Sequence, residues 1–156
     1  MNVEFINPFL VATNDVLTTM ANLNAKPGQM ALKKDNIAYG DVTGFIGLIG
    51  DKVKGSFSIS FTEAAILDIT QRMLGEKLTS IDDTVTDMVG ELTNMATGGA
   101  KRLLQEQGHD FDMATPVVIA GKNHEIIHKS RGPIIILPFE TSSGQFFIEV
   151  SFEDIR

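Results

Sequence analysis

Two groups of residues in this sequence have the types and the spacing that chemistry requires. The first is residues 124–128, which read His-Glu-Ile-Ile-His and satisfy the H-E-x-x-H pattern of zinc metallopeptidases. In those enzymes the motif lies on a helix, so that both imidazoles reach one zinc ion and the glutamate polarises the zinc-bound water.

The sequence around this motif favours a strand over residues 124–129 instead of a helix. A glycine precedes the motif, a Gly-Pro pair follows it, and the neighbouring runs on both sides are rich in valine and isoleucine. On a strand, His124 and His128 share a face but lie about 13 Å apart, at ~3.3 Å per residue, which is too far to hold one ion. We therefore predict two ordinary histidines on a strand or hairpin, and no metal site.

The second group lies on a long helix that the sequence predicts from near Ser80 to about Gln107. Successive helical residues are turned by about 100°, which places an apolar stripe at Ile81, Val85, Met88, Leu92, Met95, Ala96, Gly99 and Leu103. A second stripe lies roughly opposite and consists of Asp87, Glu91, Asn94, Gly98, Lys101 and Gln105. We expect the first stripe to face the core and the second to face outward.

Solvated surface is the simplest interpretation of an outward polar stripe, but the glycines of this helix indicate a contact surface. Gly90, Gly98 and Gly99 each destabilise a helix interior by about 1 kcal/mol relative to alanine. Close packing in the core would explain Gly99. Gly98 lies on the exposed stripe, where the missing side chain leaves the face flat and allows another surface to approach the backbone.

Glu91 and Asn94 are three residues apart, so their side chains project side by side. A carboxylate can pair with a cation, and a carboxamide, which both donates and accepts hydrogen bonds, can orient a water molecule without titrating. The sequence shows no Ser/His/Asp set, no phosphate-binding loop and no metal cluster. A Glu/Asn pair alone cannot build a hydrolase, but it can complete a site whose metal and electrophile belong to another protein.

Composition limits the classes of protein to which the chain can belong. Its 156 residues fit one domain, 1–156, with 43% hydrophobic and 21% charged residues. A net charge of −7 lacks the basic surface of a nucleic-acid or anionic-membrane binder. There is no cysteine, no signal peptide and no apolar run that reaches the roughly 18 residues of a membrane span. We expect a soluble, cytoplasmic protein.

Helix and strand signals alternate along the first half of the chain. Asn7 is a suitable N-cap and Pro8 a suitable first residue, so we expect the first helix to begin there. Thr62 should cap a second helix that ends at Gly75. Between them we expect strands near 33–39, 42–49 and 54–61, with a turn at 50–52.

The second half repeats this order after the long helix, for which Ser80 and Asp83 form a potential capping box and Gly108 the end. Strands are expected at 116–120, 124–129, 134–141 and 145–152, the last two joined by a turn at 142–144. The pattern predicts an α/β fold of the α+β type, a pseudo-twofold repeat of one helix plus three antiparallel strands.

The Glu91-x-x-Asn94 motif, preceded by Asp87 and followed by Gly98, resembles the helix motif of the CheC/CheX/FliY phosphatases of bacterial chemotaxis. The resemblance also covers residues 5–9 at the first helix and the closing hairpin from 135 to 152. Its single motif and its length make the chain most similar to the CheX type.

This resemblance implies hydrolysis of the aspartyl phosphate on a CheY-like response regulator. By residue, it implies that Asn94 orients the attacking water, that Glu91 pairs with a regulator lysine, and that Asp87, Gly98 and Lys101 contact the partner. Mg²⁺ would be held by the regulator, with no cofactor bound by this chain. The resemblance also implies a homodimer.

Three other interpretations stay open at this point. The chain could be a non-catalytic module or scaffold that binds a response regulator through the same helix face. It could be a plain structural dimer, or a zinc hydrolase that uses residues 124–128. The first half of the repeat should not form a second site, because Val11 stands where Glu91 stands in the second half, although Asn14 keeps the amide.

Overall fold

The computed structural model describes residues 3–155 and shows in them one antiparallel sheet and three helices. The helices are α1 (Val3–Ala21), α2 (Glu63–Leu74) and α3 (Asp83–Glu106). The strands are β1 (Lys26–Pro27), β2 (Ala31–Leu32), β3 (Val42–Gly50), β4 (Val53–Phe61), β5 (Phe111–Met113), β6 (Val117–Ala120), β7 (Ile134–Glu140) and β8 (Gln145–Asp154).

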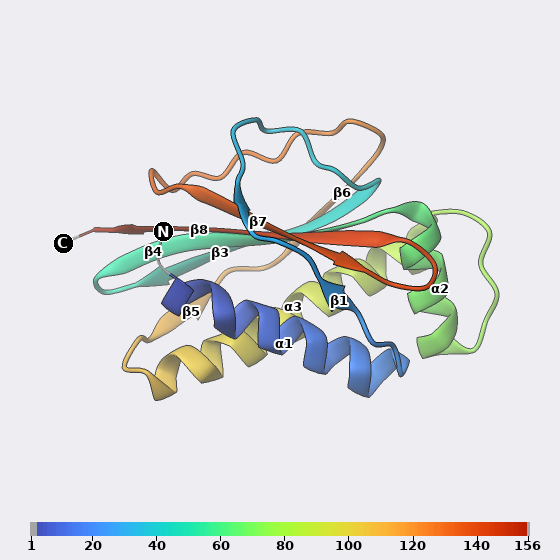
Figure 1. The fold of residues 1–156 in the computed structure, drawn as a ribbon, viewed down its shortest axis with the longest axis horizontal. Coiled ribbons are helices and arrows are strands. Elements are labelled where there is room, and N and C mark those ends of the chain that lie inside the picture. Colours follow the sequence, from blue (N-terminus) through green and yellow to red (C-terminus); the bar gives the residue numbers. More distant parts are fainter. Residues whose placement is uncertain (1–2, 156) are drawn as a thin grey trace.

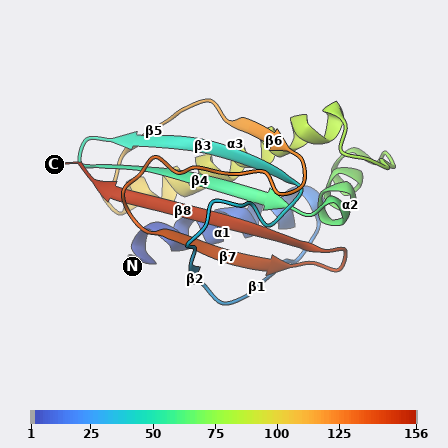
Figure 2. The same cartoon turned by 90° about the horizontal axis from the view of Figure 1, so that it is seen from above.

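The sheet is built from two hairpins that meet at its centre. β3 pairs with β4, β7 pairs with β8, and the long strands β4 and β8 pair with each other from Val53↔Asp154 to Phe61↔Phe146. The short strands β1 and β2 flank β7, and β5 and β6 flank β3 in the corresponding way. Each half therefore supplies the outer strands of the other half's hairpin, which confirms the predicted pseudo-twofold α/β fold (Figure 2).

Helices α1 and α3 lie side by side beneath one face of the sheet, while α2 stands at one end (Figure 1). Between helices and sheet lies the apolar core, where Phe9 of α1 stacks on Phe57 of β4 with ring centroids 4.7 Å apart. Two long loops, 33–41 and 121–133, cross the opposite face (Figure 1). One face of the sheet is thus packed by helices and the other by loops.

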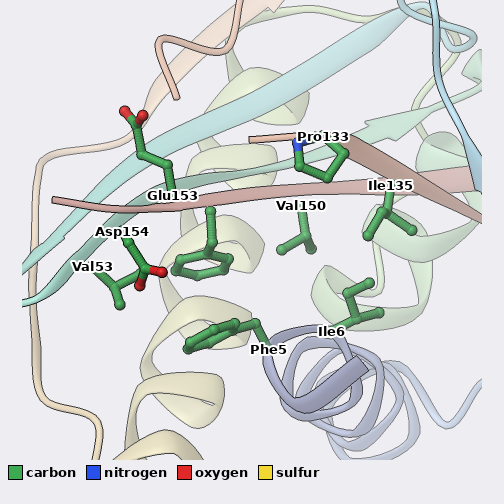
Figure 3. A pocket seen from close by; sticks show the side chains of 9 residues that line it. Phe5, Ile6, Val53, Pro133, Ile135, Val150, Glu153 and Asp154 are labelled. Atoms are coloured by element: carbon green, nitrogen blue, oxygen red, sulfur yellow. The ribbon is translucent and has the colours of Figure 1, made fainter. Parts of the chain in front are cut away.

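The start of α1 packs beneath β4, β7 and β8 at one end of the sheet. Figure 3 shows Phe5 and Ile6 of α1 beneath the strands, on the side of the sheet to which Val150 points, and they line a hollow of about 240 Å³. The Phe5 ring stacks on Phe152 with a centroid distance of 4.7 Å. Burial of Phe5 and Ile6 therefore anchors the first turns of the helix.

This anchoring explains why the predicted start of α1 at Asn7-Pro8 is wrong. The described helix already includes Val3, and Pro8 lies inside it. Proline in a helix interior removes one backbone hydrogen bond. Burial of Phe5 and Ile6, which are 8% and 2% exposed, offsets that loss because each such side chain contributes roughly 1.5–3 kcal/mol.

Several local predictions are confirmed. Helix α2 has its N-cap at Thr62, whose side chain accepts a hydrogen bond from Ala65 N, and it ends at Gly75 in a left-handed conformation with φ 72°. Both hairpins have their predicted turns, at Asp51-Lys52 and between β7 and β8. These signals succeeded because capping and tight turns depend on residues adjacent in sequence.

The predicted strands at 33–39 and 124–129 are wrong. Both segments belong to the loops over the sheet, and one isolated bridge, Ile37↔Glu125, joins them. The short strands β1, β2 and β5 were not predicted. Their hydrogen-bond partners are far away in sequence, so tertiary pairing and not the local pattern decides which short segments become strands.

The N-cap of α3 is Asp82, not Ser80 as the capping-box pattern predicted. The Asp82 carboxylate accepts a hydrogen bond from Val85 N at 3.1 Å, and the helix begins at Asp83. A carboxylate also interacts favourably with the positive end of the helix dipole. The Asp82 carboxylate therefore caps the first turn of α3, and the Ser80 side chain is not needed for this cap.

We expect Asp82→Ala to lower the free energy of unfolding by about 1 kcal/mol, because the N-cap hydrogen bond is lost. Ser80→Ala, two residues away and outside the helix, should change it by less than ~0.5 kcal/mol. Urea denaturation of both variants measures the difference. Equal destabilisation by the two substitutions would contradict the assignment of the cap to Asp82.

Candidate functional site

Helix α3 is held on two sides, and its remaining face is open. Its buried residues point toward the sheet and α1; they are Val85, Val89, Leu92, Thr93, Ala96, Thr97, Ala100 and Leu104. The buried face of α3 is therefore rotated relative to the predicted apolar stripe. Four residues of that stripe are only partly buried: Met88, Met95, Gly99 and Leu103. Ile81 lies ahead of the helix.

Small residues and hydroxyl groups bring α3 close to its neighbours. A Cβ at Gly44 of β3 would collide with the Thr93 side chain, so α3 can lie this close to β3 only because residue 44 is glycine. Thr93 satisfies its buried hydroxyl by donating a hydrogen bond to Val89 O at 2.7 Å. On the other side, a Cβ at Gly99 would lie 3.0 Å from Ala12 Cβ of α1, so Gly99 packs closely, but against α1 at a partly buried position and not in the core.

Glu91 and Asn94 project from the open face. Glu91 is exposed and Asn94 is partly buried. Within residues 3–155, neither side chain makes a hydrogen bond or ion pair. A three-residue separation places the two groups about 4.5 Å apart along the helix axis and about 60° apart around it. Both polar groups are therefore available to a molecule that approaches α3 from solvent.

Asp87 and Gly98 extend this open face in both directions. Asp87 is exposed one turn before Glu91, and a Cβ at Gly98 would meet no heavy atom within 4 Å. The fold itself therefore gives no packing reason for glycine at 98. Asp87, Glu91, Asn94 and Gly98 together form one surface, which we call the motif face.

Lys101 belongs to the same stripe but interacts with the end of α3. Its Nζ lies 3.8 Å from an Asp110 carboxylate oxygen, and Gln105 donates a hydrogen bond to the same carboxylate at 2.8 Å. The Gln105 hydrogen bond is the main cause that holds the pKa of Asp110 below its ordinary value, and Lys101 adds to it. Lys101 is therefore partly engaged within the chain.

The histidines of the H-E-x-x-H segment each have partners on the sheet. His124 Nε2 lies 2.6 Å from Thr43 Oγ1, whereas His128 Nδ1 lies 2.6 Å from Ser56 Oγ. Both belong to the loop over the sheet and not to one helical face. Among residues 3–155, no group of three or more histidine and carboxylate side chains could hold a metal ion.

His128 is part of a buried polar cluster that the sequence did not reveal. Its Nε2 lies 3.1 Å from one oxygen of Glu149, and Lys33 Nζ lies 3.0 Å from the other. A neutral imidazole protonated on Nε2 satisfies this geometry, because it donates to Glu149 and accepts from Ser56. The cluster ties both loops to β4 and β8, so its role in this structure is to fix the loop-covered face.

The fold, together with an exposed helix face that carries a carboxylate and an amide, is that of a CheC-like protein. A family model described as "Chemotaxis phosphatase CheX" matches residues 42–140. The chain belongs to this family. None of its helices within the described residues is long and apolar enough to cross a membrane.

Three relatives illustrate the similarity. A CheC-like superfamily protein from a Shewanella species is 60% identical, with a TM-score of 0.93 over 98% of this chain and 99% of that one. A chain of the CheX–CheY–BeF3–Mg²⁺ complex from Borrelia burgdorferi is 26% identical, with a TM-score of 0.82 over 97% and 99%. The CheY-P phosphatase CheX of Thermotoga maritima is 26% identical over 149 residues, 94% of each chain.

We expect Lys33→Met to lower the free energy of unfolding by about 3–5 kcal/mol, because it leaves the Glu149 carboxylate buried without its cation. Lys34→Met removes the same charge from an exposed neighbouring position and serves as the matched control. Thermal and urea unfolding of both proteins measure the effect. A similar, small loss in the two variants would show that the ion pair is not needed to fix the loops.

Proposed function

We propose that this chain hydrolyses the aspartyl phosphate of a CheY-like response regulator, and that residues 1–156 act as one CheX-like domain in the cytoplasm. The observation that carries the proposal is the pair Glu91 and Asn94. In a chain of the CheX family, both side chains lie on an exposed helix face without a partner inside the described molecule. Their chemistry matches what such a reaction needs from a second protein.

Asn94 is proposed to orient the attacking water. Its amide oxygen accepts one hydrogen of the water and leaves an oxygen lone pair directed at phosphorus, in line with the bond that breaks. The water oxygen forms the new bond to phosphorus, and the aspartate carboxylate of the regulator leaves with the bonding electrons. The products are inorganic phosphate, which retains the water protons at this stage, and a free aspartate. Because the amide does not titrate, its contribution is position.

Glu91 is proposed to fix the register between the two proteins. A carboxylate three residues before Asn94 can pair with a lysine on the regulator beside the phosphoaspartate, and so hold the amide at the correct distance. The metal is assigned to the regulator, where Mg²⁺ would neutralise phosphate charge.

The alternative function is binding without catalysis. A regulator-binding module or scaffold could use the same face, and exposure of Glu91 and Asn94 is compatible with it. The presence of an amide beside the carboxylate favours the enzyme, because docking alone needs no water-orienting group. Homodimerisation stays a prediction from the family resemblance, and sedimentation of the purified chain addresses it.

We expect Asn94→Ala to lower kcat for dephosphorylation by roughly 10²-fold, because misplaced water costs about that much. The assay follows decay of a phosphorylated CheY-type regulator with Mg²⁺ and catalytic amounts of the chain. Binding to the beryllofluoride-loaded regulator should be retained. Asn14→Ala, at the corresponding position of α1, is the matched control and should leave kcat unchanged.

The results separate the two functions. Acceleration by the wild type that vanishes in Asn94→Ala but persists in Asn14→Ala supports the phosphatase. Tight binding with no acceleration by the wild type would leave a docking module. An equal loss of activity in both asparagine variants would show that the effect comes from lower general stability and not from the motif face.

We expect substitutions at Gly98 to stabilise the protein while weakening activity. Gly98→Ala should raise the free energy of unfolding by about 1 kcal/mol, because alanine favours the helix and the space is open. Gly98→Leu should stabilise the helix similarly but raise KM more, because its side chain projects into the approach path. Steady-state kinetics and urea unfolding test the pair. Unchanged KM in the leucine variant would show that no partner approaches this position.

A further inference from the structure

A surface groove runs between α1 and α3 directly beside the motif face. It has a volume of about 310 Å³ and is lined by Ala12, Asp15, Val16, Thr19, Met20, Met95, Gly99, Arg102 and Leu103. The two helices lie side by side in both views of the ribbon (Figures 1 and 2). Because Gly99 has no side chain, α1 comes close at Ala12, and the groove opens outward from that contact.

The groove continues the motif face without a break. Met95 follows Asn94 and Gly99 follows Gly98, and each step turns the helix by about 100° toward α1. On the opposite flank of α3, a Cβ at Gly90 would lie 3.6 Å from Val118 Cγ2 of β6, so the helix runs close to that strand. The groove lies on the other flank, next to α1, and extends the motif face there.

The chemistry of the groove suits a protein partner. Its floor and walls include Val16, Met95 and Leu103, and Met20 is 47% exposed. Charges of opposite sign stand at the rim, Asp15 on α1 and Arg102 on α3, both exposed and without ion pairs among residues 3–155. An apolar floor with a charged rim is the usual arrangement of a protein–protein contact.

We propose that this groove receives an apolar side chain of the phosphorylated response regulator, so that α1 forms one half of the docking surface. The inference rests on the proposed function. A regulator that brings its phosphoaspartate to Asn94 must cover the adjoining residues, because stable contacts bury about 800 Å² on each partner. The motif face is a single stripe of one helix, and the groove is its recessed continuation.

The occupant is the regulator and not a second copy of this chain, because of where the groove lies. A second copy seated in the groove would stand one residue from Asn94 and obstruct the approach to the amide. The regulator must reach that amide, and its apolar surface beside the phosphoaspartate can enter the groove in the same encounter. Glu91 and the rim charges would then surround the apolar contact with polar ones.

Two neighbouring threonines on α1 provide a matched test. Thr18 and Thr19 are both exposed, but Thr19 lines the groove and Thr18 does not. Thr19→Arg extends a long cation over the groove, whereas Thr18→Arg adds the same charge outside it.

The first measurement is the Kd for the beryllofluoride-loaded, Mg²⁺-bound regulator. We expect Thr19→Arg to weaken binding roughly tenfold, as obstruction of a central contact does. Thr18→Arg should bind as the wild type does. Equal affinities for the two arginine variants would overturn the proposal. So would a change in sedimentation of Thr19→Arg without a change in Kd, because the groove would then belong to an interface between copies.

Kinetics distinguish failure of docking from failure of catalysis. If the wild type accelerates dephosphorylation, Thr19→Arg should raise KM while kcat stays within about twofold, because the amide is untouched. If the wild type binds the regulator but does not accelerate decay, the proposed function fails and the affinities still decide the role of the groove. A fall in kcat with unchanged KM in Thr19→Arg would contradict a docking role.

Discussion

The pairing of β4 with β8 is the constraint on which the rest of this structure depends. These two strands come from different halves of the chain and stay in register along their whole length, from Val53↔Asp154 to Phe61↔Phe146. Each brings its hairpin partner, β3 or β7, and the short outer strands of one half complete the hairpin of the other. The two halves therefore cannot fold as separate sheets, and their helices α1 and α3 are brought beneath the same surface.

Beneath this sheet, close contacts of α3 with β3 and α1 determine which face of α3 is exposed to solvent. Glycine at 44 admits the Thr93 side chain against β3, and Gly99 admits α1 at Ala12. With both flanks fixed, Glu91 and Asn94 stand on the remaining face, and their side chains make no hydrogen bond or ion pair within residues 3–155. Rigid support matters for the proposed chemistry, because an amide that contributes only by position loses its effect when it is free to move.

Some local signals predicted the structure correctly, but the helix starts expected at Asn7-Pro8 and Ser80 were wrong, and contacts between distant segments could not be predicted. The caps of α2 and the turns of both hairpins could be predicted because a few adjacent residues decide them. Residues 124–129 were predicted as a strand because their composition is β-like. In the structure this segment crosses a face of the sheet (Figure 1), where His128 bonds to Ser56 and Glu149. The motif residues could be chosen from helical periodicity. The groove beside them could not, because it exists only where α1 meets α3.

The two halves of the internal repeat differ at the position of the motif, and this difference fits the separate roles proposed for α1 and α3. At the position of α1 that corresponds to Glu91 stands Val11, whose side chain is 43% exposed and cannot pair with a cation. A symmetrical molecule would present two equivalent faces, and each would need its own approach path. Thr19 and Met20 of the same helix instead line the groove beside the single motif face. In the proposed complex the two helices are therefore complementary, α3 for the chemistry and α1 for the contact.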